Sequence, residues 1–174
     1  MFDTLATPTS LSADLLAIGW QTGFSIRENL RPIDAGELRR TVNGTLVNLM
    51  VDEFRKYALT ISSDDIRPPA LAHLWRGSQL TITPASEIGD MIAAGGSSRT
   101  LARTPASGTI RCLTKRFDAV PFTISGKVVT LPSPAVGVVR IYYRPVLSMM
   151  VVGWSADTDE AEASTAWSID LEEV

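Results

Sequence analysis

The sequence has a single histidine, His73, and a single cysteine, Cys112, among its 174 residues. Two such residues cannot supply a structural zinc site, a disulfide bond or a CxxC redox pair. We interpret His73, which lies between Ala72 and Leu74, as a packed or capping side chain rather than a catalytic base. No GxSxG motif marks a serine nucleophile. We therefore predict that the protein is not an enzyme and uses no cofactor or metal.

Long apolar runs are also absent. The longest, from Val146 to Trp154, is far shorter than the roughly 20 residues that a membrane span needs. The first residues, MFDTLATPTS, lack the basic start and apolar core of a signal peptide. We expect synthesis in the cytoplasm and no membrane partner. The length predicts a single domain, residues 1–174, and the 45% apolar and 20% charged composition is that of a globular protein.

The charged residues are unevenly distributed along the chain. Residues 99–150 carry eight basic groups and one acid, Asp118, whereas residues 151–174 carry seven acids and no base. Thirteen of the sixteen basic residues are Arg, the cation that is enriched at protein interfaces, although a GC-rich genome also favours Arg. The two segments can neutralise one another within a subunit or between neighbouring subunits, and the sequence leaves both alternatives open.

Alternating apolar and polar residues, typical of β-strands, dominate the chain. They occur around Asn43-Gly44, which predicts a hairpin turn, over Tyr57–Ile61, and over Trp167–Leu171. Leu71, Leu74 and Trp75 follow two prolines at helical spacing, which predicts a short α-helix over residues 68–76. Residues 86–108 contain Gly95-Gly96-Ser97-Ser98 and are expected to form a long loop or excursion. The fold class predicted is mainly β, an antiparallel sandwich or barrel.

Two stretches carry a family resemblance. The order RRTVNGTLVNL, FRKYALTIS, PPALAHLWRG and GSQLTITP, within residues 38–84, resembles the opening of tail-tube and distal-tail (baseplate hub) β-domains of tailed bacteriophages. The closing segment YYRPVLSMMVVGWSADTDEAEASTAWSIDLEEV, residues 142–174, is similar to the ends of small virion proteins from tailed phages. Residues 86–135 resemble no family.

The resemblance implies a structural virion protein that assembles into a homo-oligomeric ring, with itself and other virion proteins as partners. Passive contact with packaged DNA is compatible with this role, and sequence-specific nucleic-acid binding is not expected. Such a ring would be built from strand edges, apolar anchors and Arg–carboxylate pairs. The candidate subunit-interface residues are Arg111, Arg116, Arg140, Arg144, Trp154, Asp157, Asp159, Glu160, Trp167, Glu172 and Glu173.

Three alternatives remain at this stage. A capsid decoration (cement) protein would use the same sandwich on a head lattice. A carbohydrate-binding β module would have a cleft lined by Trp20, Trp75 or Trp154 together with convergent carboxylates. A basic, aromatic β surface could also bind single-stranded nucleic acid in a salt-dependent manner.

Overall fold

The structure, a computed structural model, describes residues 10–11, 26–33, 38–49 and 54–174. Strands make up 52% of the described residues, with almost no helix, and the sheets are antiparallel. This confirms the predicted β class. The strands are β1 (Ser10–Leu11), β2 (Arg27–Pro32), β3 (Leu38–Arg40), β4 (Leu46–Asn48), β5 (Tyr57–Asp65), β6 (Gln79–Thr83), β7 (Ile88–Ile92), β8 (Ser98–Thr100), β9 (Arg111–Leu113), β10 (Thr123–Ser125), β11 (Val128–Thr130), β12 (Val139–Tyr143), β13 (Leu147–Asp159) and β14 (Ser164–Glu173).

The chain divides into two compact units. Unit 1 comprises residues 1–13 and 81–147, and unit 2 comprises residues 14–80 and 148–174. One curled sheet has six strands in the order β1-β6-β13-β14-β5-β2. The single domain expected from the sequence stays a prediction, because two compact units can belong to one domain or to two.

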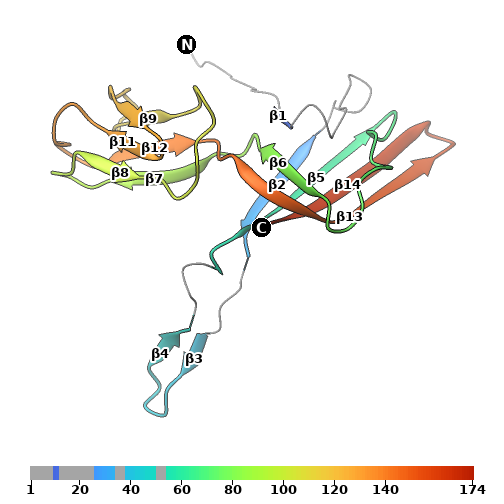
Figure 1. The fold of residues 1–174 in the computed structure, drawn as a ribbon, viewed down its shortest axis with the longest axis horizontal. Coiled ribbons are helices and arrows are strands. Elements are labelled where there is room, and N and C mark those ends of the chain that lie inside the picture. Colours follow the sequence, from blue (N-terminus) through green and yellow to red (C-terminus); the bar gives the residue numbers. More distant parts are fainter. Residues whose placement is uncertain (1–9, 12–25, 34–37, 50–53) are drawn as a thin grey trace. The chain divides into compact units, whose positions relative to one another are not determined.

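Unit 1 is built on two three-stranded sheets, β7-β12-β9 and β10-β11-β8 (Figure 1). Buried side chains from both sheets form one hydrophobic cluster, which a sandwich needs because each sheet must cover its apolar face. The members of the cluster are Ile92, Leu101, Cys112, Val129, Leu131, Ala135, Val139, Ile141 and Tyr143. Strand β12 alternates buried and half-buried residues along its whole length, as a central strand with one covered face should.

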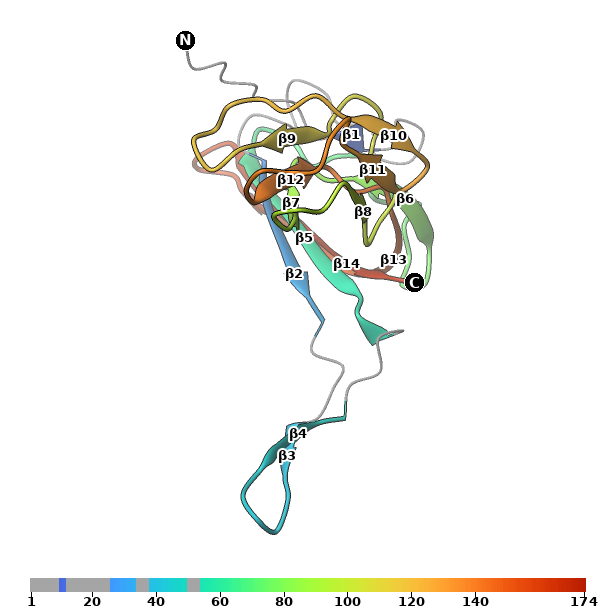
Figure 2. The same cartoon turned by 90° about the vertical axis from the view of Figure 1, so that its left-hand side faces the viewer.

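In unit 2, strand β5 pairs with β2 on one side and with β14 on the other (Figure 2). Directly opposed residues of antiparallel strands point to the same face, so Leu59 and Leu171, and Ile61 and Ile169, share the buried face. The opposite face carries Thr60, whose hydroxyl donates to Asp170 Oδ1 at 2.7 Å. The alternation predicted for Tyr57–Ile61 and Trp167–Leu171 is therefore confirmed.

Strand β13 pairs with β14 through a register shift between Val151 and Gly153. Val151 opposes Leu171 and Gly153 opposes Asp170, which leaves Val152 as the extra residue of a β-bulge. Beyond the bulge, Trp154 opposes Ile169 and is 43% exposed. The two strands continue as a hairpin to Asp159 and Ser164.

The helix expected over residues 68–76 is absent, and this prediction was wrong. The segment forms consecutive turns instead, in which Leu74 N donates to the Leu71 carbonyl at 2.9 Å and Ser78 N donates to the Trp75 carbonyl at 2.9 Å. Leu71 and Leu74 are buried as their spacing indicated. Consecutive turns bury Leu71 and Leu74 without the costly nucleation of so short a helix, but they leave Trp75 77% exposed.

The long loop expected over residues 86–108 is also corrected, since strands β7 and β8 lie within it. The glycines form the turn that joins these strands. Gly95 has φ +82°, and its N–H donates to the Ala135 carbonyl at 2.7 Å. A Cβ at Gly96 would lie 3.1 Å from the Ile92 side chain. These two glycines therefore permit a tight turn against neighbouring chain rather than a loose excursion.

The hairpin predicted around Asn43-Gly44 is present as β3 and β4, although its turn differs in detail. Only Gly44 has positive φ, at +79°, and the turn residues are Val42 and Asn43. The Thr41 carbonyl accepts from Gly44 N at 2.8 Å, and Thr41 N donates to the Thr45 carbonyl at 2.9 Å. Every described residue of this hairpin, from residue 38 to residue 49, is exposed.

Candidate functional site

The loop of residues 114–118, which follows β9, holds two of the cations of unit 1 in a fixed arrangement. Thr114 N donates to the Asp118 carbonyl at 2.9 Å, and Thr114 Oγ1 accepts from the N–H groups of Arg116 and Asp118, each at 3.2 Å. Phe117 has φ +67°, a conformation uncommon for a residue with a side chain, and its ring is 65% exposed. These hydrogen bonds thus fix the backbone that carries Lys115 and Arg116.

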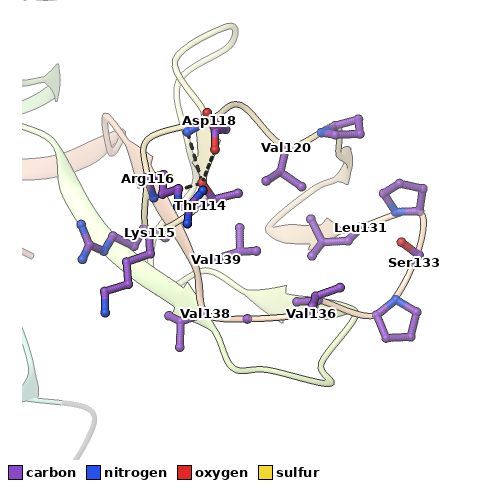
Figure 3. Close-up of a pocket in the computed structure, with 16 residues that line it drawn as sticks. Thr114, Lys115, Arg116, Asp118, Val120, Leu131, Ser133, Val136, Val138 and Val139 are labelled. Atoms are coloured by element: carbon purple, nitrogen blue, oxygen red, sulfur yellow. Dashed lines mark hydrogen bonds between the residues drawn. The ribbon is translucent and has the colours of Figure 1, made fainter.

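A groove of about 790 Å³ lies between this loop and residues 131–140 (Figure 3). Val120, Leu131 and Val139 point into it, and prolines stand at one end, with Lys115 and Arg116 at the other (Figure 3). The complete lining is Thr114, Lys115, Arg116, Asp118, Val120, Pro121, Leu131, Pro132, Ser133, Pro134, Ala135, Val136, Gly137, Val138, Val139 and Arg140. The groove therefore has apolar walls and a mostly basic rim.

Arg140 and Arg144 were predicted together, but the structure gives them different environments. Arg140 is half-buried, lines the groove, and has its guanidinium carbon 5.7 Å from the centroid of the Phe117 ring. Arg144 is only 5% exposed, and its Nε donates to the Pro84 carbonyl at 2.6 Å while Nη2 donates to the Thr83 carbonyl at 3.2 Å. Arg144 is thus an internal residue of unit 1, and we correct its assignment to the interface.

Arg111 and Arg116 are both exposed, and only Arg116 borders the groove. Arg111 forms an ion pair with Glu87, which lies on the segment leading into β7. Because Glu87 already balances its charge, Arg111 is a weaker candidate for a contact with another molecule.

The acidic residues predicted for the interface gather at the end of the β13–β14 hairpin. Asp157, Asp159 and Glu160 are all exposed, and so is the neighbouring Glu162. Asp159 Oδ1 accepts from the N–H groups of Ala161 at 2.8 Å and Glu162 at 3.2 Å, which fixes the loop. We call residues 157–164 the acidic tip.

Glu172 and Glu173, the other two acids of the predicted interface, lie at the C-terminal end of β14. Glu172 is exposed and opposes Ala58 of β5. Glu173 Oε2 accepts from Tyr57 N at 3.0 Å, so this carboxylate supports the start of β5. The sequence placed Glu172 and Glu173 in one set with the acidic tip, whereas the structure separates them along the full length of the strand.

The tryptophans differ in burial. Trp167 is 3% exposed on the buried face of β14, and its indole N–H has no hydrogen-bond partner among the described residues. Its burial takes it out of the predicted interface set, which is a second correction. Trp154 is 43% exposed, and its Nε1 donates to the Leu74 carbonyl at 2.8 Å. Trp75, the residue after Leu74, is 77% exposed.

The β3–β4 hairpin is the surface that the list of candidate residues omitted. Its exposed apolar side chains are Leu38, Val42, Leu46, Val47 and Leu49. The pattern β-former, Asn-Gly, β-former predicted the hairpin itself. Nothing in that pattern said whether the chain would cover it, and for residues 38–49 it does not.

The potential metal ligands in the described part of the chain are His73, Cys112 and the side-chain carboxylates. No group of three His, Cys, Asp or Glu residues there is placed to hold a metal ion. Burial raises the pKa of the Cys112 thiol to about 11, which leaves it protonated and unreactive at neutral pH. Within the same described residues, no helix is long and apolar enough to cross a bilayer.

Comparisons with protein-family models, with curated proteins and with solved structures found no match to this chain.

Proposed function

We propose that this chain is a structural assembly subunit that associates with copies of itself, and that the assembly is a ring in the tail of a bacteriophage virion. The observation that carries the self-association is the β3–β4 hairpin. A two-stranded hairpin is at best marginally stable in water, and this one exposes five large apolar side chains over residues 38–49. An exposed apolar surface of this kind is typical of a contact with another protein.

The chemistry of the hairpin supports a protein partner. Leu38 and Arg40 are two residues apart in β3 and point to the same face, and Leu46 opposes Arg40. Leu38 and Leu46 therefore lie on one face. Arg40 Nη1 donates to the Gly44 carbonyl at 2.9 Å, so its guanidinium lies folded against the turn. Arginine is enriched at protein interfaces, and exposed leucine and valine side chains favour association through the apolar area that a contact buries. The assignment to a tail rests on the sequence resemblance of residues 38–84 and 142–174.

The test is the mass of the purified protein in solution, measured by light scattering over a range of concentrations and about 50 to 500 mM salt. We expect a closed oligomer, or a monomer that assembles as concentration rises. A hexamer or dodecamer favours a tail ring, whereas a trimer favours a capsid cement protein. A monomer at every concentration and salt overturns the proposal.

A matched pair of variants assigns the association to the hairpin. Leu38→Ser with Leu46→Ser should raise the concentration needed for assembly at least about tenfold, because two apolar anchors are lost. Ile66→Ser with Val174→Ser removes apolar side chains of similar exposure elsewhere in unit 2 and should leave assembly unchanged. Equal effects of the two pairs would show that the hairpin has no special part in assembly.

A carbohydrate-binding module is the second candidate, and the exposed pair Trp75 and Trp154 favours it. The Trp154 indole bonds the carbonyl directly before Trp75, so the two aromatic residues belong to one surface of unit 2. Exposed indole rings are platforms on which sugar rings stack. Trp20, the third tryptophan predicted for such a cleft, lies outside the described residues. Saturable glycan binding by a monomeric protein that Trp75→Ala abolishes would favour this function over assembly.

A further inference from the structure

The groove of unit 1 and the acidic tip of unit 2 are two exposed surfaces of opposite charge. Lys115, Arg116 and Arg140 border the groove against a single acid, Asp118. The acidic tip carries four carboxylates and no cation. Close charges of opposite sign between surfaces set the register of a contact and speed its formation.

The groove has the features of a binding surface in addition to its charge. Its volume of about 790 Å³ lies within the range of protein sites that enclose a ligand or several side chains. Val136 at its edge is fully exposed, and Val138 is also exposed. Pro132 and Pro134 restrict the backbone on this side, and the bonded loop of residues 114–118 restricts the other. Little conformational freedom would be lost when an occupant binds.

The acidic tip ends in a hydrogen-bonded turn that carries small side chains. Two small apolar residues, Ala161 and Ala163, flank Glu162. Asp159 fixes the loop through the N–H groups of Ala161 and Glu162, and Ala163 has φ +50°. Small side chains would let the backbone approach the apolar walls of a groove, and the carboxylates of Glu160 and Glu162 would be available to pair with basic residues at its rim.

We propose that the acidic tip of one copy of the chain binds in the groove of a second copy. The inference rests on the proposed function for the identity of the partner, because it assumes self-assembly. The contact joins two different surfaces, so each subunit offers one tip and one groove. Contacts of this head-to-tail kind close into a ring when the rotation between subunits permits.

Disulfide trapping between two separately purified proteins tests the contact directly. One carries Val136→Cys in the groove and the other carries Ala161→Cys in the tip, both in the full chain. The native Cys112 stays in place because its buried thiol, with a pKa of about 11, is unreactive. On mixing under mild oxidation with oxidised glutathione, we expect a mixed disulfide whose rate exceeds that of a control at least about tenfold. The control replaces Val136→Cys with Lys127→Cys, an exposed position in the same unit outside the groove.

Charge reversal provides a second, independent readout. Lys115→Glu with Arg116→Glu in the groove protein should reduce the mixed disulfide to the control rate. Glu160→Lys with Glu162→Lys in the tip protein should restore it with that reversed groove. Restoration separates a direct contact from a folding defect, because a misfolded groove would not regain its partner.

The outcomes also separate this contact from self-assembly as such. A mixed disulfide that forms no faster than the control overturns the proposed contact. If light scattering still shows an oligomer, the proposed function survives that result. A Val136→Cys, Ala161→Cys double variant that oxidises within one chain at high dilution, with no gain in mass, overturns the assignment to a second copy. Absence of both the oligomer and the mixed disulfide overturns both proposals.

Discussion

Two hairpins of this chain have similar alternating sequences but differ in the burial of their apolar side chains. The β13–β14 hairpin buries Ile169 and Leu171 against β5 and leaves its acidic tip exposed. The β3–β4 hairpin leaves all its described residues exposed, including Leu38 and Leu46. Alternation specifies a strand with an apolar face, but it does not say which surface covers that face. The first hairpin buries its apolar face within its own chain, and the second, which leaves its apolar side chains exposed, is the one that we propose to contact a partner.

The largest expected effect is a loss of stability in the buried hairpin. Ile169→Ala removes a fully buried side chain from β14 and should lower the free energy of unfolding by about 3 kcal/mol. Leu46→Ala, on the exposed hairpin, should change it by less than about 0.5 kcal/mol. Urea unfolding of the monomer at low concentration measures both. A Leu46→Ala cost as large as that of Ile169→Ala would mean that the β3–β4 hairpin is packed within the chain.

Arg140 at the groove and Arg144 in the interior allow the same comparison between a half-buried and a buried residue. Arg144→Met leaves the carbonyls of Thr83 and Pro84 without their buried donor, which should cost about 2 kcal/mol of stability. Arg140→Met loses a contact with the exposed Phe117 ring and should cost about 0.5 kcal/mol. Thermal unfolding of the two variants compares them under one condition. A larger loss of stability for Arg140→Met than for Arg144→Met would contradict the placement of Arg144 in the interior and of Arg140 at the groove.

A pH-dependent effect concerns Cys112 in the core of unit 1. Burial raises the pKa of its thiol from 9.0 to about 11, so the unfolded chain loses the proton first as pH rises. Its contribution to stability is complete below about pH 9 and declines by about 1–2 kcal/mol between pH 9 and pH 11. Subtracting the pH profile of Cys112→Ala from that of the wild type isolates this decline. A flat difference would mean that the thiol is accessible to solvent.

Local signals in the sequence predicted much of the sheet structure. Asn43-Gly44 marked a hairpin, and the burial of Leu59, Ile61, Ile169 and Leu171 followed from alternation. The spacing of Leu71 and Leu74 predicted their burial correctly but their helix wrongly, because consecutive turns also bring residues i and i+3 to one side. Gly95 and Gly96 indicated a break in regular structure. Sequence alone could not show that the break was only a turn between two strands.

The groove could not have been found from the sequence. Its two walls come from residues 114–121 and 131–140, which meet because β9 pairs with β12. That pairing is a long-range choice that no local pattern encodes. The acidic tip, by contrast, is a continuous stretch, and the count of charges located it. The loss of Arg144 and Trp167 from the candidate set has the same origin, since burial depends on the neighbours that the fold supplies.

Val152, the extra residue in β13, changes which residues of that strand point to each face. Before Val152 the odd-numbered residues, such as Val151 opposite Leu171, share a face with the buried residues of β14, and after it the even-numbered ones, such as Trp154 opposite Ile169, lie on that face. Without this one-residue shift, Asp157 and Asp159 would lie on the face of the hairpin that carries Trp167. A single inserted residue therefore places both carboxylates on the face opposite to that indole.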